Sequence, residues 1–158
     1  MIRRTVQLVA LLGILAVTGF LFVWLRSEYL SVVALGAISQ SHIDGNVPPD
    51  SLFDDLLRRD LLLYFHPLLG DRLTVDFELL RRGATQTGIA YPKFYLWVLV
   101  RQDGKPLNEG YARVAAVDRT GFTITDFIPR TAVAEDSSIL FPVFPAPVVA
   151  AIMTRQRR

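Results

Sequence analysis

The sequence contains no cysteine, which excludes disulfide bonds, thiolate zinc sites and thiol nucleophiles. It contains two histidines, His42 and His66, each at the end of a predicted helix and neither in a metal-binding spacing such as H-x₃-H or H-E-x-x-H. We interpret both as helix-terminating residues whose imidazoles lie near the last carbonyl groups of a helix. The sequence therefore predicts no metal site and no cofactor.

Two motifs of catalysis and ligand binding are also missing. No G-x-S-x-G sequence is present, which excludes the nucleophile elbow of a serine hydrolase. Residues 83–88 (GATQTG) space two glycines as a phosphate-binding loop does, but Ile89 and Ala90 stand where that loop needs Lys and Ser or Thr. We interpret these residues as a connection between two strands.

Charge of either sign is sparse, and its distribution argues against a nucleic-acid partner. The chain has 17 basic and 15 acidic residues, and the basic excess comes from the two ends: Arg3, Arg4, Arg26, Arg155, Arg157 and Arg158. Residues 27–154 carry eleven basic and fifteen acidic residues, a net charge of −4. Because nucleic-acid binding needs a basic surface, we predict no nucleic-acid partner.

One long uncharged segment, residues 5–25, follows Arg3 and Arg4 and ends at Arg26. As a helix it is about 31 Å long, close to the ~30 Å hydrocarbon core of a bilayer. We therefore predict a transmembrane helix at 5–25 that contacts the lipid bilayer, after a cytoplasmic N-terminus at 1–4. The positive-inside rule places the rest of the chain outside. Fifteen arginines against two lysines indicate a GC-rich codon usage, from which we expect a bacterium, a cell inner membrane and a periplasmic domain.

Three other interpretations of the apolar segments are weaker. A cleavable signal peptide has a shorter apolar region, ~7–15 residues, ending at a small-x-small site, which is missing near Leu25. Arg3 and Arg4 resemble a twin-arginine export signal, but plain positive-inside charge explains them better. Residues 139–153 are uncharged but too short for a second span, and contain three prolines that remove backbone donors.

The body of the chain predicts an α+β fold. Residues 26–48 form a helical linker, and residues 49–158 form the extracytoplasmic domain. Within this domain the patterns predict a helix at 51–66, strands at 73–82, 94–100, 109–118 and 122–128, a coil after Pro129, and a short C-terminal helix at 147–155. Closely spaced strands without intervening helices pair antiparallel. We expect helices packed on one face of a four-stranded antiparallel sheet.

Aromatic residues on the central strands are the strongest candidate for a ligand site. Tyr95, Trp97 and Tyr111, with Asp126 near the end of the last strand, can line a hollow for an apolar ligand. Ordinary core packing explains the same aromatics and is the more frequent reason for them. A second carboxylate pair, Asp76 and Glu78, shares one face of its strand, which we interpret as solvent-exposed.

Apolar residues in the proline-rich C-terminal segment are candidates for docking on a partner protein. Phe141, Phe144 and Val148 are the main ones, with Val143 and Val149 beside them. Such residues either pack within their own domain or dock on another protein.

The strand sequences 110–117 (GYARVAAV) and 122–127 (FTITDF), joined by the turn Asp118–Gly121, carry a resemblance. They resemble the last two strands of NTF2-like domains, which are cone-shaped α+β folds. One span before such a periplasmic domain is similar in layout to VirB8-type secretion-channel components. The resemblance covers residues 50–128 and implies a curved sheet with a hollow; it assigns no functional residue by position.

Three functions follow as expectations. The first is a single-pass membrane-anchored accessory or scaffolding protein, not an enzyme, whose periplasmic domain binds partners in an envelope complex. The second is an apolar small-ligand binding protein that uses a cone-shaped cavity. The third, furthest behind, is an isomerase-like enzyme in the same cavity, with Asp126 or Asp76 as base and a tyrosine as proton donor.

Overall fold

The computed structural model describes residues 2–86 and 90–157, with side chains from residue 17 onward. The chain divides into two compact units, Met1–Gln40 and Ser41–Arg158. The second unit contains the sheet, the hydrophobic core and every residue of the candidate site.

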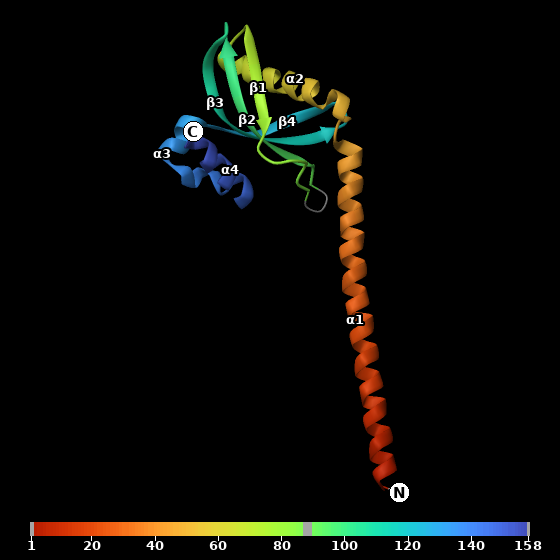
Figure 1. Ribbon diagram of the computed structural model, residues 1–158. Helices are drawn as coiled ribbons and strands as arrows, with labels where there is room; N and C mark the ends of the chain where they lie inside the picture. Colours follow the sequence, from red (N-terminus) through yellow and green to blue (C-terminus); the bar gives the residue numbers. More distant parts are fainter. Residues whose placement is uncertain (1, 87–89, 158) are drawn as a thin grey trace. The chain divides into compact units, whose positions relative to one another are not determined.

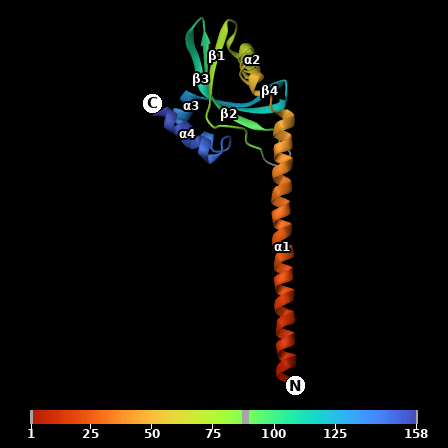
Figure 2. The same ribbon diagram turned by 45° about the vertical axis from the view of Figure 1, so that its right-hand side comes forward.

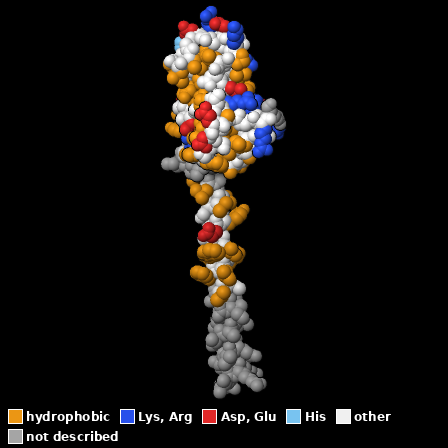
Figure 3. Space-filling model, turned by 90° about the vertical axis from the view of Figure 1, so that its left-hand side faces the viewer, with side chains coloured by type: hydrophobic (Ala, Val, Ile, Leu, Met, Phe, Trp, Pro, Cys, Tyr) orange, Lys and Arg blue, Asp and Glu red, His pale blue; other side chains and the backbone are white. Residues whose placement is uncertain are grey.

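Helix α1 (Ile2–Asn46) is a continuous α-helix of 45 residues, about 67 Å long. Its part Val17–Asn46 is long and apolar enough to cross a membrane, with a mean hydropathy of 1.5 and none of that window buried. Figure 3 shows hydrophobic side chains on the surface of this helix. The predicted span at 5–25 and most of the predicted linker at 26–48 therefore belong to one helix; the side chains of residues 5–16 lie outside the described part.

The second unit is an α+β domain, as predicted. Helix α2 (Asp50–Leu69) precedes four antiparallel strands that follow one another in the sheet order β1-β2-β3-β4. These are β1 (Leu73–Leu79), β2 (Lys93–Gln102), β3 (Lys105–Asp118) and β4 (Gly121–Pro129). Figures 1 and 2 show a strongly bent sheet, and register shifts beside Val100, Arg113 and Ala116 mark its irregular points.

The chain after β4 is helical, which corrects the predicted coil. Pro129 is followed at once by α3 (Arg130–Glu135) and the 3₁₀-helix η1 (Ser137–Leu140), and α4 (Ala146–Gln156) closes the domain. Proline is favoured at a helix start because its fixed φ suits the first turn. The Asp136 carboxylate accepts a hydrogen bond from the Ser138 N–H, which caps η1. A side-chain cap thus marks the start of η1, whereas α3 begins directly after Pro129 without one.

Helices cover both faces of the sheet, so the prediction of a single covered face is wrong. One core cluster joins α2 to the even-numbered residues of β2 and β3, with Leu61, Phe65 and Leu96 at its centre. A second cluster joins the opposite face to the C-terminal segment, which we define as residues 130–156: α3, η1, the turn at 141–145 and α4. Alternation along β2 explains both clusters, because successive side chains point to opposite faces.

Helix α2 continues three residues past its predicted end. Pro67 lies inside its last turn, where the missing N–H removes one hydrogen bond without ending the helix. Burial of Phe65 holds this turn against the sheet, and the Gly70 N–H donates to the His66 carbonyl. Packing therefore overrides the local preference against helix before proline.

Asp60 ties α2 to the start of β4. Its carboxylate is almost fully buried, accepts the Phe122 N–H at 2.7 Å and pairs with the Arg59 guanidinium at 2.8 Å. A buried backbone N–H that loses its acceptor costs roughly 1–3 kcal/mol.

We expect Asp60→Ala to lower the free energy of unfolding by about 1–3 kcal/mol, because the Phe122 N–H loses its acceptor. Urea denaturation followed by Trp97 fluorescence, in a Trp24→Phe background, measures this. Asp55→Ala, on an exposed position of the same helix, is the matched control, with a change of about 0.5 kcal/mol or less. Equal changes in the two variants would contradict a tying role for Asp60.

Candidate functional site

The four residues predicted to bind a ligand lie on one face of the sheet, which we call the aromatic face. Trp97 stands opposite Tyr111 across the β2–β3 ladder. Tyr95 stands opposite Arg113, which in turn stands opposite Asp126. Glu78, on β1, stands opposite Trp97. Residues directly opposite one another in an antiparallel pair share a face, so the structure brings Tyr95, Trp97, Tyr111 and Asp126 together.

The C-terminal segment packs over the aromatic face. Tyr111 is fully buried, and the Tyr95 ring lies 5.9 Å from the Phe144 ring, centroid to centroid. Two of the three predicted docking residues, Phe144 and Val148, belong to this buried cluster. The third, Phe141, is 66% exposed. The predicted ligand residues and two of the predicted docking residues thus contact one another inside one core.

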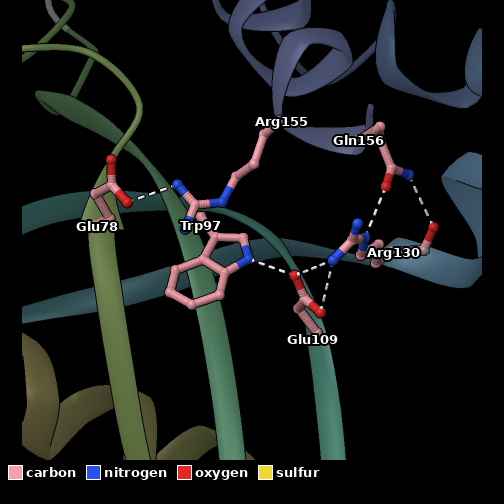
Figure 4. A network of polar contacts seen from close by, with 6 residues as sticks. All are labelled: Glu78, Trp97, Glu109, Arg130, Arg155 and Gln156. Carbon is pink, nitrogen blue, oxygen red and sulfur yellow. Dashed lines mark hydrogen bonds and ion pairs between the residues drawn. The ribbon is translucent and has the colours of Figure 1, made fainter. Parts of the chain in front are cut away.

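A polar network borders this cluster and links three strands to the C-terminal segment (Figure 4). Trp97 donates its indole N–H to the Glu109 carboxylate at 2.8 Å. Arg130 binds both oxygens of Glu109, at 2.9 and 3.1 Å, and its Nε donates to Gln156. Arg155 pairs with Glu78 at 2.5 Å, and its guanidinium carbon lies 4.0 Å from the centre of the Trp97 ring. Trp97 is therefore held by a hydrogen bond at its edge and a cation over its face.

Each described carboxylate of β1, β3 or β4 on the aromatic face has a guanidinium partner. Asp126 pairs with Arg113 at 2.6 Å, and the same guanidinium donates to the Val143 carbonyl in the loop before α4. Glu78 and Glu109 pair as described above, and Asp76 pairs with Arg101. These groups are positioned as ion pairs. Among the described residues, no three His, Cys, Asp or Glu side chains gather as metal ligands.

The Tyr111 hydroxyl is a buried polar group without a hydrogen-bond partner in the described part of the chain. Burial raises the pKa of this phenol above its usual range, and the nearby Glu109 carboxylate adds to the rise. The guanidinium groups of Arg130 and Arg155 oppose it. The Tyr95 hydroxyl, in contrast, lies 2.9 Å from the Thr85 hydroxyl. Tyr111 is thus the one aromatic side chain of this face whose polar atom the fold leaves unsatisfied among the described residues.

An open depression of about 490 Å³ lies beside the polar network. It is lined by residues of β3, α3 and α4: Leu107, Asn108, Glu109, Arg130, Thr131, Ala134 and Gln156. Its only charged lining residues are Glu109 and Arg130, which pair with each other; the other lining residues carry amide, hydroxyl or apolar groups.

Sequence reasoning missed Glu109, Arg130 and Gln156, and it treated Arg155 as part of a basic tail. Alternation along β3 places Glu109 on the same face as Tyr111, a signal that was available in the sequence. Arg130 and Gln156 could not be found from strand alternation, because one lies in a segment predicted as coil and the other at the end of the chain.

No known protein family, no curated protein and no solved structure matches this chain. The fold and site described above are therefore the basis for a functional proposal.

We expect Tyr111→Phe to leave the free energy of unfolding unchanged at pH 7 or to raise it by up to about 1–2 kcal/mol, because the lost hydroxyl has no hydrogen-bond partner among the described residues. The wild type should lose stability above about pH 10, where an unfolded tyrosine ionises while buried Tyr111 stays protonated. Tyr111→Phe should reduce that loss. Urea denaturation at pH 7, 9 and 10.5 measures both effects, with exposed Tyr91→Phe as control. If the free energy of unfolding depends on pH in the same way in Tyr111→Phe and Tyr91→Phe, the raised pKa of Tyr111 is contradicted.

We expect Phe144→Ala to destabilise the domain by about 3–5 kcal/mol, the range for a phenylalanine removed from a packed core. Phe141→Ala should change stability by about 0.5 kcal/mol or less, because its side chain is exposed. Thermal unfolding of the two variants in the same detergent compares them directly. A large loss on Phe141→Ala would show that this side chain packs within its own domain.

Proposed function

We propose that this protein is a single-pass membrane-anchored accessory or scaffolding protein, whose α+β domain binds partner proteins in an envelope complex. The observation that carries the proposal is the exposed apolar surface of Val17–Asn46, where none of the most apolar window is buried. An apolar surface of this size needs lipid or protein to cover it. The second unit, which begins at Ser41, has its own core, so the apolar residues before it are not needed to complete that core.

The packing of the aromatic face favours a protein partner over a small ligand. Phe144, Val148 and Ile152 fill the space against Tyr95 and Tyr111 that an apolar ligand would need. The carboxylates on this face are paired with guanidinium groups, so none is positioned as a free base. Both observations also argue against an isomerase-like activity.

Apolar-ligand binding is the second candidate. The Tyr111 hydroxyl favours it, because this buried polar atom has no hydrogen-bond partner among the described residues and a ligand could supply one. A ligand would have to displace part of the C-terminal segment to reach this hydroxyl.

The proposed location is the inner membrane, with the N-terminus in the cytoplasm and the domain in the periplasm. Arg3 and Arg4 before the apolar helix support this orientation through the positive-inside rule. The bent four-stranded sheet is compatible with a cone-like domain of the NTF2 type behind one span, as in VirB8-type components. A reporter fused after Arg158 that is active only in the cytoplasm would contradict this orientation.

The proposal predicts that the protein, extracted gently from its native membrane, carries a fixed set of envelope proteins at stoichiometric levels. Mass spectrometry of the purified material measures this. Phe141→Ser should reduce partner recovery at least fivefold if the predicted docking role is correct. Leu63→Ser, on α2 and also 66% exposed, is the matched control. A wild-type protein that is recovered alone would contradict the scaffolding function and direct attention to the ligand.

A further inference from the structure

Strand β1 is an edge of the sheet whose outward backbone groups can be identified from its two ends. Leu80 donates its N–H to the Tyr95 carbonyl, and Asp103 donates its N–H to the Arg72 carbonyl. These bonds flank an unbroken register between β1 and β2. In an antiparallel ladder they fix the even-numbered residues of β1 as the ones bonded to β2. The N–H and C=O groups of Leu73, Val75, Phe77 and Leu79 therefore point away from the sheet.

Arg58 of α2 is the side chain that the described residues place on this edge. Its guanidinium donates to the Val75 carbonyl, which confirms that this carbonyl points outward, and lies 5.3 Å from the centre of the Phe77 ring. Val75 is only 1% exposed as a whole residue, so the edge is covered at this point, and an incoming strand has to displace the Arg58 guanidinium to reach the Val75 carbonyl.

The other free edges of the sheet carry features that prevent strand pairing. The start of β3, Lys105–Glu109, lies beyond the end of β4 and contains Pro106 and a register shift. On β4, Asp60 occupies the Phe122 N–H, the register shifts beside Arg113, and Pro129 ends the strand. Lysine, proline and bulges are the usual protections of an edge. β1 contains no proline, no glycine and no register shift.

The side chains of β1 define which strand would fit beside it. Leu73, Val75 and Phe77 belong to or pack against the core under α2, so one side of a neighbouring strand would meet apolar groups. Asp76 and Glu78 point to the other face and remain 51% and 62% exposed despite their arginine partners. A complementary strand therefore alternates apolar residues with basic ones. A second copy of β1 fits poorly, because in the fully overlapped antiparallel register Asp76 stands directly opposite its own copy.

We propose that the outer edge of β1 binds an extended segment of a partner protein by adding a strand to the sheet, with apolar and basic residues alternating along that segment. The proposal rests on the scaffolding function above and specifies the binding surface. The added strand pairs with the outward groups of Leu73, Val75, Phe77 and Leu79, and takes the Val75 carbonyl from Arg58.

The test uses the full chain in lipid nanodiscs and a nine-residue peptide alternating valine and lysine. A peptide of the same composition with its valines and lysines in two blocks is the control probe. Amide hydrogen exchange should slow at least tenfold at Val75 and Phe77 with the alternating peptide alone. Slowing at β4 instead, equal slowing with the block peptide, or no slowing at saturating peptide would overturn the proposal.

Two pairs of variants separate the backbone contribution from the charge contribution. Leu79→Pro removes an outward N–H at the exposed end of β1 and should weaken peptide binding about five- to tenfold, whereas Leu79→Ala keeps that N–H and should change it about twofold or less. Asp76→Asn should weaken binding about threefold, while Glu135→Gln, at the end of α3, should not. Equal effects within either pair would contradict the assigned geometry.

The same variants distinguish the edge from the scaffolding function. If stoichiometric partners remain bound to Leu79→Pro protein, the function stands and the β1 edge is not their binding surface. If no partner protein is recovered with the wild type, the scaffolding function is contradicted, whether or not the alternating peptide binds to β1.

Discussion

Strand β2 places Phe94, Leu96 and Val98 on one face of the sheet and Tyr95 and Trp97 on the other, and this double-sided apolar character constrains the whole domain. Both faces must be removed from water, because each exposes large aromatic or branched side chains. Helix α2, which precedes the strands in the sequence, covers the first face. The C-terminal segment, which follows the strands, covers the second. The two ends of the domain are therefore both part of its core.

The two coverings are attached differently. On the α2 face, apolar contacts dominate, and Asp60 supplies a buried polar tie to β4. On the aromatic face, arginines of the C-terminal segment reach carboxylates of β1 and β3, as Arg155 does with Glu78 and Arg130 with Glu109. Partly exposed pairs of this kind contribute roughly 0–1 kcal/mol each. They fix where the segment lies, while burial of residues such as Ile152 supplies most of the free energy.

The strands were predictable because their patterns depend on local alternation and turn residues. Asp118–Gly121 reads as a tight turn from sequence, and the Thr120 N–H does bond the Asp118 carboxylate. Cover on both faces of the sheet was also predictable, because the continuously apolar sequence of β2 indicates a strand that is buried on both sides. Helix α3 was not predictable, because a segment of six residues is too short to show a helical repeat of apolar residues. The pairing of Asp126 with Arg113 depends on register, and the partners of Arg155 and Arg130 depend on tertiary contacts that no local pattern encodes.

The length of α1 adds an argument for a partner in the membrane region. Apolar sequence at residues 5–25 is followed, after Arg26 and Glu28, by a second apolar stretch at 29–38 whose large side chains are exposed. Residues 5–38 of a continuous helix measure about 51 Å, whereas the hydrocarbon core measures about 30 Å. One bilayer crossing therefore cannot cover both stretches unless the helix is steeply tilted, beyond the ~40° seen at the upper end for single helices. Whichever stretch lies in lipid, the other presents an apolar helix surface to the aqueous or headgroup region, where protein contact is the means of burying it. This excess of apolar length supports the proposed scaffolding function, in which a partner protein covers the apolar stretch that lies outside the lipid.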